Sequence, residues 1–326
     1  RQVARGAGLP STIPASIINK VCASGAKALM LAAQTIRLGD ADVIVAGGME
    51  SMSNIPHYVT HHRTGFKYGS QELLDGIVRD GLQDIYEKVM MGEAGERTAE
   101  KFGFSREDQD EYAIQSYKRA EAAADKLKTE ITPVTLKTRK GEVVVDVDEE
   151  PQRVRYDKIP KLRTAFRKEG TITAANASKL NDGAAALVLV SEKFLMAHNL
   201  KPIARVASWA DAAREPMEFT IAPADALPKA VEKAGISKDQ LDTVEINEAF
   251  SVVAMANTKI LELDPEKVNP IGGAVSLGHP LGCSGARIAG SALTQLRHEG
   301  GKYGALGICN GGGGASAIVF ENLVDA

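Results

Sequence analysis

A short stretch near the end of the chain repeats one near its start. Residues 24–27 (SGAK) match residues 284–287 (SGAR), and each copy begins a run that is typical of a helix. Each helical run is followed by an apolar segment that ends in glycines, at 43–48 and at 305–314. A repeated unit of turn, helix, strand and glycines predicts two similar α/β halves built around a shared site.

The length of the chain fits two such halves. At 326 residues, with 44% hydrophobic and 25% charged residues, there is room for two domains or for one α/β body with an insertion. Residues 54–170 hold most of the charge and several amphipathic patterns, which indicates an inserted loop domain. We therefore predict an N-terminal half at 1–53 and 171–192, the loop domain at 54–170, and a C-terminal half at 193–326.

Local patterns predict the elements of this plan. Residues 24–38 predict a helix that ends at Gly39, since glycine is a common left-handed stop. Ser105 and Asp108 predict a capping box at the start of another helix. Two apolar runs predict strands of the buried kind: 43–48 and 184–190.

Charge and cysteine content exclude several classes of protein. The net charge of −3 gives no indication of a nucleic-acid partner, and no apolar run approaches the ~20 residues of a membrane span. The three cysteines, Cys22, Cys283 and Cys309, do not make a disulfide scaffold, which favours a reducing compartment. Cys283 is interpreted as a small packing residue.

Four residues at turns could carry chemistry. Cys22 precedes the first helix, whose dipole would favour a thiolate, and the glycines after Cys309 let backbone N–H groups face an oxyanion. His279 stands between a glycine and a proline, and Asn247 lies between a strand and a helix. Each has a plain alternative: an inert cysteine, a flexible turn, a hydrogen-bonded loop histidine, a helix cap. Their joint position at turns of a duplicated fold favours cysteine-based covalent catalysis.

Five motifs carry a resemblance to a known family. They are VCASG at 21–25, GGMESMS at 47–53, NEAF at 247–250, GGAVSLGHPLGCSGAR at 272–287 and CNGGGGASA at 309–317. Along its full length the chain resembles the thiolases, and among them the mitochondrial thiolases that act on acetoacetyl-CoA. The resemblance implies the α/β thiolase fold, with two similar halves in α/β/α/β/α layers and an inserted loop domain.

The resemblance also implies a role for each candidate residue. Cys22 takes the acyl group from acyl-CoA, His279 activates it and helps to hold a thioester oxygen, and Cys309 moves the proton on or off the α-carbon of acetyl-CoA. Asn247 holds a water in one oxyanion hole together with His279. The N–H groups of Cys22 and Gly311 form the second hole. The implied reaction is the reversible conversion of 3-ketoacyl-CoA and CoA into acyl-CoA and acetyl-CoA.

Binding positions follow from the same resemblance. The residues implied in binding CoA are Tyr117, Arg153, Val154, Arg155, Lys158 and Ser178, and Phe219 matches a position linked to 2-methyl-branched substrates. Arg153, Arg155 and Lys158 form a basic cluster that suits phosphates. An implied potassium site maps to Tyr117, Ala174, Ala175, Ala177 and Val275. The other implied features are a homotetramer, a mitochondrial matrix location with cytoplasm or peroxisome as alternatives, and neither nucleic acid nor membrane as partner.

Two departures from the family pattern leave alternatives open. Met90-Met91-Gly92 stands where biosynthetic thiolases carry His-Met-Gly, which favours a degradative 3-ketoacyl-CoA thiolase of broader chain length as one alternative. The family begins about one βαβ unit earlier, so we expect that first unit to be missing and the chain alone to be unstable or inactive. A truncated isoform that binds acyl-CoA without turnover is the second alternative.

Overall fold

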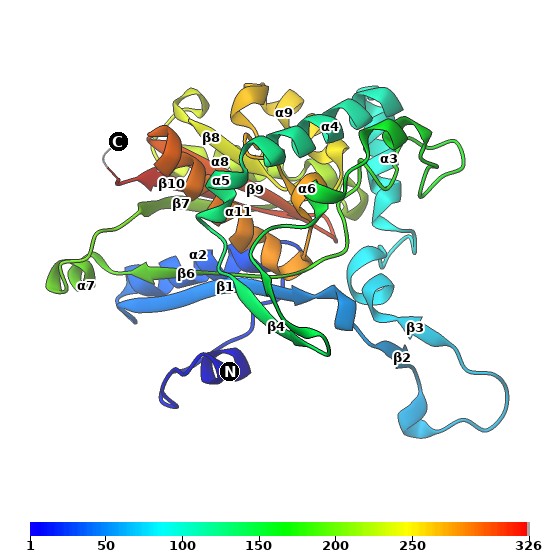
Figure 1. Ribbon diagram of the computed structural model, residues 1–326, viewed down its shortest axis with the longest axis horizontal. Helices are drawn as coiled ribbons and strands as arrows, with labels where there is room; N and C mark the ends of the chain where they lie inside the picture. The colour runs from blue at the N-terminus through cyan, green and yellow to red at the C-terminus, as the bar shows by residue number, and fades with distance from the viewer. Residues whose placement is uncertain (325–326) are drawn as a thin grey trace.

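The computed structural model describes residues 1–324 and stacks helices and strands in four layers (Figure 1). A two-stranded sheet is the first layer, and helices α2 (Ser24–Leu38) and α11 (Leu281–Glu299) are the second. A four-stranded sheet is the third, and helices α8 (Pro223–Lys233) and α9 (Ser251–Leu261) are the fourth. The four-stranded sheet is therefore covered on both faces by helices, as in other α/β folds.

The two sheets differ in their pairing. In the smaller sheet β1 (Val43–Ser51) runs antiparallel to β6 (Asp182–Val190), with Val43 opposite Val190. The larger sheet has the order β7–β10–β9–β8 and is parallel only between β8 and β9. Its strands are β7 (Ala204–Ala213), β8 (Thr243–Ile246), β9 (Tyr303–Asn310) and β10 (Gly314–Asn322).

The two copies of the sequence repeat meet in space. Helices α2 and α11 pack together at Gly25 and Gly285. A Cβ atom on Gly25 would lie 2.6 Å from the backbone nitrogen of Ala286, and one on Gly285 would clash with the backbone of Ala26. Only glycine permits this close approach, so the repeated Ser-Gly-Ala is the contact between the central helices. Helix α2 ends at Gly39 with φ 81°, as the sequence predicts.

One sequence-based expectation needs correction. The apolar runs at 43–48 and 184–190 were expected to be buried, but in β1 and β6 exposed residues alternate with partly buried ones, and only Ala46 is buried. Val45 and Val188 are 56% and 66% exposed. Helices α2 and α11 cover one face of this sheet, and within residues 1–324 its other face leaves valine and methionine side chains in contact with solvent.

The loop segment at 54–170, inserted within the N-terminal half, adds helices that pack beside the C-terminal half. The capping box is confirmed, because Ser105 Oγ accepts from the Asp108 N–H and Asp108 accepts from the Ser105 N–H. Helix α4 then packs against α10, next to the C-terminal half. The helices of the loop segment are α3 (Met91–Phe102), α4 (Arg106–Ala122), α5 (Ala124–Lys128) and α6 (Glu150–Arg153), whereas α10 (Ala274–Leu277) belongs to the C-terminal half.

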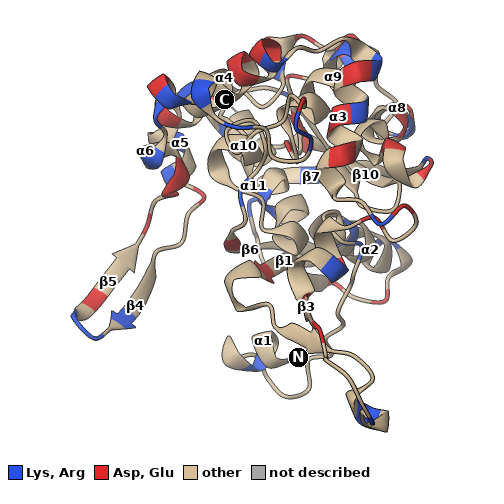
Figure 2. Ribbon diagram, turned by 90° about the vertical axis from the view of Figure 1, so that its right-hand side faces the viewer, with Lys and Arg blue, Asp and Glu red and all other residues tan. Residues whose placement is uncertain are grey.

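A hairpin of the same segment projects from the body (Figure 2). Every residue of β4 (Val134–Thr138) and β5 (Gly141–Val145) is exposed. The remaining short elements are α1 (Gln2–Gly6), α7 (Glu192–Ala197), the hairpin of β2 (His57–Val59) and β3 (Leu73–Asp75), a π-helix at Val78–Leu82, and 3₁₀ turns that include Tyr156–Lys161 and Pro216–Ile221. Among the described residues no helix is long and apolar enough to cross a membrane.

Candidate active site

Cys22 lies at a strained turn just before helix α2. The preceding residue, Val21, has φ 49°, which is rare for a β-branched residue and is typical of functional turns. The N–H groups of Gly311 and of Cys22 itself favour the thiolate, but burial outweighs them and raises the pKa of the Cys22 thiol to about 11. Burial therefore outweighs the expected stabilisation of a thiolate at the helix start, and Cys22 is a thiol at neutral pH.

His279 is buried beside the start of helix α11. Its backbone N–H donates to Asn181 Oδ1 at 3.1 Å and to the Lys179 carbonyl at 3.3 Å. Gly278, at φ 98°, allows this turn, because a side chain there would clash with Asn181. Burial lowers the pKa of His279 to about 3, and the positive charge of Arg287 acts in the same direction. The imidazole is thus neutral at pH 7 and can accept a proton.

Ser284 determines which ring nitrogen accepts that proton. Its Oγ donates to the Pro280 carbonyl at 3.0 Å and lies 2.6 Å from His279 Nδ1. Since the hydroxyl hydrogen is used on Pro280, Nδ1 carries the imidazole proton and donates it to Oγ, which leaves Nε2 as the acceptor. Sequence reasoning missed this role, although Ser284 stands in the repeat and one helical turn after Pro280.

Asn247 lies opposite His279 at the end of β8. Its Nδ2 is 3.5 Å from His279 Nε2. The helix-cap alternative is wrong, because helix α9 begins only after Phe250. Asn247 Oδ1 is buried and accepts no hydrogen bond from the described residues. The two side chains can therefore share a water that accepts from Asn247 Nδ2 and donates to His279 Nε2.

Cys309 and Gly311 complete the group around Cys22. Cys309 is fully buried at the end of β9, and burial together with the nearby Cys22 raises its pKa well above the usual range. Gly311 begins the turn between β9 and β10, and its N–H is directed at the Cys22 sulfur. Met91 Sδ is the nearest atom to the side-chain position of Gly311. The Cys22 sulfur thus has the Cys309 thiol and the Gly311 N–H as neighbours, and the Met91 thioether lies next to Gly311.

Glu50 of the GGMESMS motif links strand β1 of the N-terminal half to helix α11 of the C-terminal half. Its carboxylate accepts the Gly282 N–H at 3.0 Å in the first turn of α11. Gly48 lies so close to the Gly282 carbonyl that no side chain would fit. The sequence motif was recognised, but its task of holding the start of α11 was not.

The expected CoA residues lie in the loop segment and, for Ser178 and Phe219, outside it. Val154 packs against the buried Tyr117, and the Ser178 N–H donates to the Ala249 carbonyl at 3.1 Å. The basic residues Arg153, Arg155 and Lys158 are all exposed. Two of them have acidic neighbours: Arg153 lies 2.8 Å from Glu149, and Arg155 lies 4.0 Å from Asp157. Phe219 is buried in the core cluster that also contains Met91 and Cys309.

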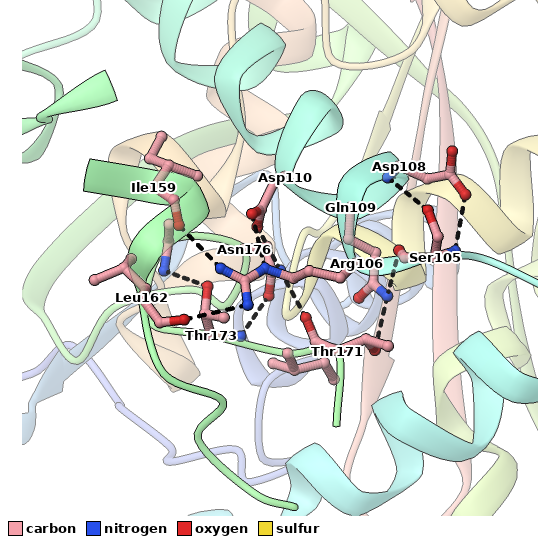
Figure 3. A network of polar contacts seen from close by, with 12 residues as sticks. Ser105, Arg106, Asp108, Gln109, Asp110, Ile159, Leu162, Thr171, Thr173 and Asn176 are labelled. Atoms are coloured by element: carbon pink, nitrogen blue, oxygen red, sulfur yellow. Dashed lines mark hydrogen bonds and ion pairs between the residues drawn. The ribbon is translucent and has the colours of Figure 1, made fainter. Parts of the chain in front are cut away.

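The turn at 173–177 is held by a polar network (Figure 3). Asn176 Oδ1 accepts the Thr173 N–H at 2.8 Å, and its Nδ2 donates to Asp110 of α4 at 2.9 Å. Arg106 bonds the same Asp110 and the Ile159 carbonyl. This network fixes the backbone carbonyl groups of the turn relative to the loop helices.

The residues of the expected potassium site do not fit a potassium ion. Lys179 Nζ donates to the carbonyl oxygens of Ala177 at 3.0 Å and Val275 at 3.3 Å, two of the five expected ligands. The same nitrogen lies 5.5 Å from the ring centroid of Tyr117, a third. Ala174 is exposed and Ala175 is buried on the same turn. A side-chain cation therefore already bonds to this group of oxygens.

Comparisons with known proteins agree with this geometry. Family models described as the N-terminal and C-terminal domains of thiolase match residues 1–193 and 200–322. The chain is 55% identical to acetyl-CoA acetyltransferase IB of Candida tropicalis, covering 99% of this chain and 81% of the relative. It is 54% identical to mitochondrial acetyl-CoA acetyltransferase of Mus musculus, covering 99% and 76%. Acat5 thiolase of Ascaris suum, solved in complex with coenzyme A, superposes with a TM-score of 0.93 at 44% identity, covering 99% and 83%.

Proposed function

Because the chain belongs to the thiolase family, we propose that it is an acetyl-CoA acetyltransferase that works through an acyl-Cys22 intermediate. The observation that carries the proposal is the pair of buried thiols of Cys22 and Cys309, with the Gly311 N–H directed at the Cys22 sulfur and a neutral His279 at the start of the adjoining helix α11. The reaction is the reversible condensation of two acetyl-CoA into acetoacetyl-CoA and CoA, with 2-methylacetoacetyl-CoA as a further substrate.

The first half-reaction needs a base, since Cys22 is a thiol at neutral pH. Its proton passes to His279 Nε2, its sulfur attacks the thioester carbonyl of acetyl-CoA, and an oxyanion forms. The N–H groups of Cys22 and Gly311 are the donors nearest to the attacking sulfur, so they stabilise that oxyanion. Collapse breaks the bond to CoA sulfur, which leaves as the thiol with the proton from His279.

The second half-reaction uses Cys309. The Cys309 thiol passes its proton to His279, its thiolate removes a proton from the α-carbon of a second acetyl-CoA, and the resulting enolate attacks the acetyl group on Cys22. Asn247 and His279 hold the thioester oxygen on which the enolate charge develops. The bond to Cys22 then breaks, the Cys22 sulfur takes the proton from His279, and acetoacetyl-CoA is released. A raised pKa suits Cys309 for this step, because it makes the thiolate a stronger base toward a carbon acid.

CoA itself is proposed to lie along the loop segment. Tyr117, Val154 and Ser178 offer a partly buried wall, and Arg153, Arg155 and Lys158 offer exposed positive charge for phosphates. We propose a homotetramer, with the exposed β4–β5 hairpin as the joining element, and a mitochondrial matrix location in line with the mouse relative. The proposed function includes no potassium ion, because Lys179 lies among its expected ligands.

A broader chain-length preference is the second candidate. Met91 lies against Gly311, and Met90 precedes it at the start of α3 where an imidazole was expected. Two flexible apolar side chains there would accept a longer acyl chain more readily than a histidine. Thiolysis rates for 3-ketoacyl-CoA substrates of increasing length separate the candidates: a sharp fall beyond acetoacetyl-CoA supports the first, and an even profile supports the second.

The mechanism is tested by a Cys309→Ala variant beside Cys283→Ala, which removes a thiol that is buried in α11. We expect Cys309→Ala to lose condensation by far more than tenfold, a barrier increase above about 1.4 kcal/mol, and Cys283→Ala to retain it. Condensation by Cys309→Ala at more than about a tenth of the normal rate would show that Cys309 is not the base. Absence of both thiolysis and condensation in the unsubstituted protein would favour a non-catalytic binder of acyl-CoA.

A further inference from the structure

One cation in the described structure is placed where the family resemblance implies a metal ion. Lys179 follows the turn at 173–177, and its side chain extends toward α10 and α4. Its ammonium group donates to the carbonyl oxygens of Ala177 and Val275 and lies over the ring of Tyr117. Carbonyl oxygens satisfy an ammonium and a hard monovalent cation alike, so the two compete for the same lone pairs.

The charges around this position suit a single cation. The carboxylates of Glu150 and Glu248 lie close enough to the Lys179 ammonium to attract its positive charge. The ring of Tyr117 adds cation–π attraction at 5.5 Å. A potassium ion on the remaining carbonyl groups would lie within a few ångströms of a like charge in a partly dehydrated site, where repulsion is strong.

The ammonium also connects two segments that hold the catalytic histidine. The carbonyl of Lys179 accepts the His279 N–H, and its Nζ bonds Val275, four residues before His279. The Val275 N–H in turn donates to Glu248 at 3.0 Å, next to Asn247 in the chain. A cation at this place therefore fixes the backbone on both sides of His279 and close to Asn247.

We propose that the Lys179 ammonium is a built-in replacement for the monovalent cation of this site, so that the protein needs no potassium. The cation is attached to the chain and needs no binding from solution. The inference concerns the same site as the proposed function and depends on it only for effects on turnover, because its test is read from thermal unfolding.

The experiment compares melting temperatures in KCl, NaCl and choline chloride at matched ionic strength. We expect the unsubstituted protein to melt at one temperature in all three salts. Lys179→Ala, which frees the carbonyl oxygens, should melt lower in choline chloride and recover by roughly 2–4 °C with KCl in a saturable manner. Lys118→Ala is the matched control, because Lys118 is an exposed lysine next to Tyr117 on α4, and it should show no potassium response.

Two results would overturn the proposal: a potassium-selective rise in the melting temperature of the unsubstituted protein, or a Lys179→Ala variant that keeps the normal melting temperature and does not respond to potassium. If Lys179→Ala does not fold, Lys179→Gln takes its place, since it is neutral but keeps a donor. Recovery of that variant by potassium supports the proposal, and no response contradicts it. An inactive protein with the expected melting pattern would contradict the proposed function alone.

Discussion

Cys22 and His279 are both neutral in the protein without substrate. The pKa of the thiol is raised to about 11 and that of the imidazole is lowered to about 3, in both cases mainly by burial. Between these values neither group carries charge, so the proton moves from sulfur to nitrogen only as attack on the substrate begins. Ser284 supports this step, because it holds the proton on Nδ1 and leaves Nε2 free.

The neutral pair predicts how Cys22 reacts with an alkylating reagent. The rate of Cys22 alkylation by iodoacetamide should rise roughly tenfold per pH unit through neutral pH and level off only near pH 11, since the thiolate is the nucleophile. Peptide mapping after short exposures measures the rate, and Cys22→Ala gives the background from the other two thiols. A rate that is constant between about pH 6 and pH 8 would instead indicate a thiolate–imidazolium pair.

The crossing of α2 and α11 fixes the spacing of the two halves. Both helices begin just after a reacting residue, so the contact at Gly25 and Gly285 also fixes the separation between Cys22 and His279. A methyl group at the crossing must move one helix, because it meets backbone atoms of the partner helix and not the end of a flexible side chain.

Two glycines of the same helix give opposite predictions. Gly285→Ala should lower the free energy of unfolding by about 1–3 kcal/mol through overpacking. Gly290→Ala should raise it by roughly 0.5–1 kcal/mol, because the added Cβ has only a Glu130 oxygen at 4.0 Å and alanine favours the helix. Urea unfolding of both variants measures the difference. Equal midpoints would show that the close approach at Gly285 is not needed for stability.

Helices and their ends were predictable where the signal lies within the helix sequence itself. The bounds of α2, the stop at Gly39 and the capping box at Ser105 follow from periodicity and end signals in the chain itself. The exposed faces of β1 and β6 were not predictable, because an apolar run does not show which of its faces another element covers.

The site was predictable through its motifs but not through its contacts. Cys22, His279, Cys309 and Asn247 were singled out by residue type and position at turns. Contacts between residues that are far apart in the sequence were missed. These are the hydrogen bond of Glu50 to the start of α11 and that of Lys179 to the Val275 carbonyl. A lysine next to Ser178 gives no sign in the sequence that its ammonium will bond to the Val275 carbonyl, 96 residues further along.

At the scale of the whole molecule, the β4–β5 hairpin extends outward without a covering element among the described residues (Figure 2). It exposes several apolar side chains, Val134, Leu136, Val143, Val144 and Val145. An exposed two-stranded ribbon with apolar residues is only marginally stable by itself, which favours a second copy of the chain as its partner.

The hairpin can be removed without touching the reacting residues. Replacing residues 134–145 by a short Gly-Ser linker should lower the molar mass in solution from tetramer to smaller species while acetylation of Cys22 is retained. Light scattering coupled to gel filtration measures the first effect. Substitution of Lys137 and Lys140 by Ser is the control, since it changes the tip of the hairpin and keeps the apolar residues. A linker variant that remains tetrameric would exclude the hairpin as the joining element.

The central claim is that Cys22 carries the acyl group and that Cys309 acts only afterwards. The direct measurement is acid-quenched labelling with radioactive acetyl-CoA, followed by mapping of the labelled peptide. The account predicts label on Cys22 in the unsubstituted protein, the same label at near-normal yield in Cys309→Ala, and no label in Cys22→Ala. Label on Cys309 or Cys283, or label that survives in Cys22→Ala, would contradict it.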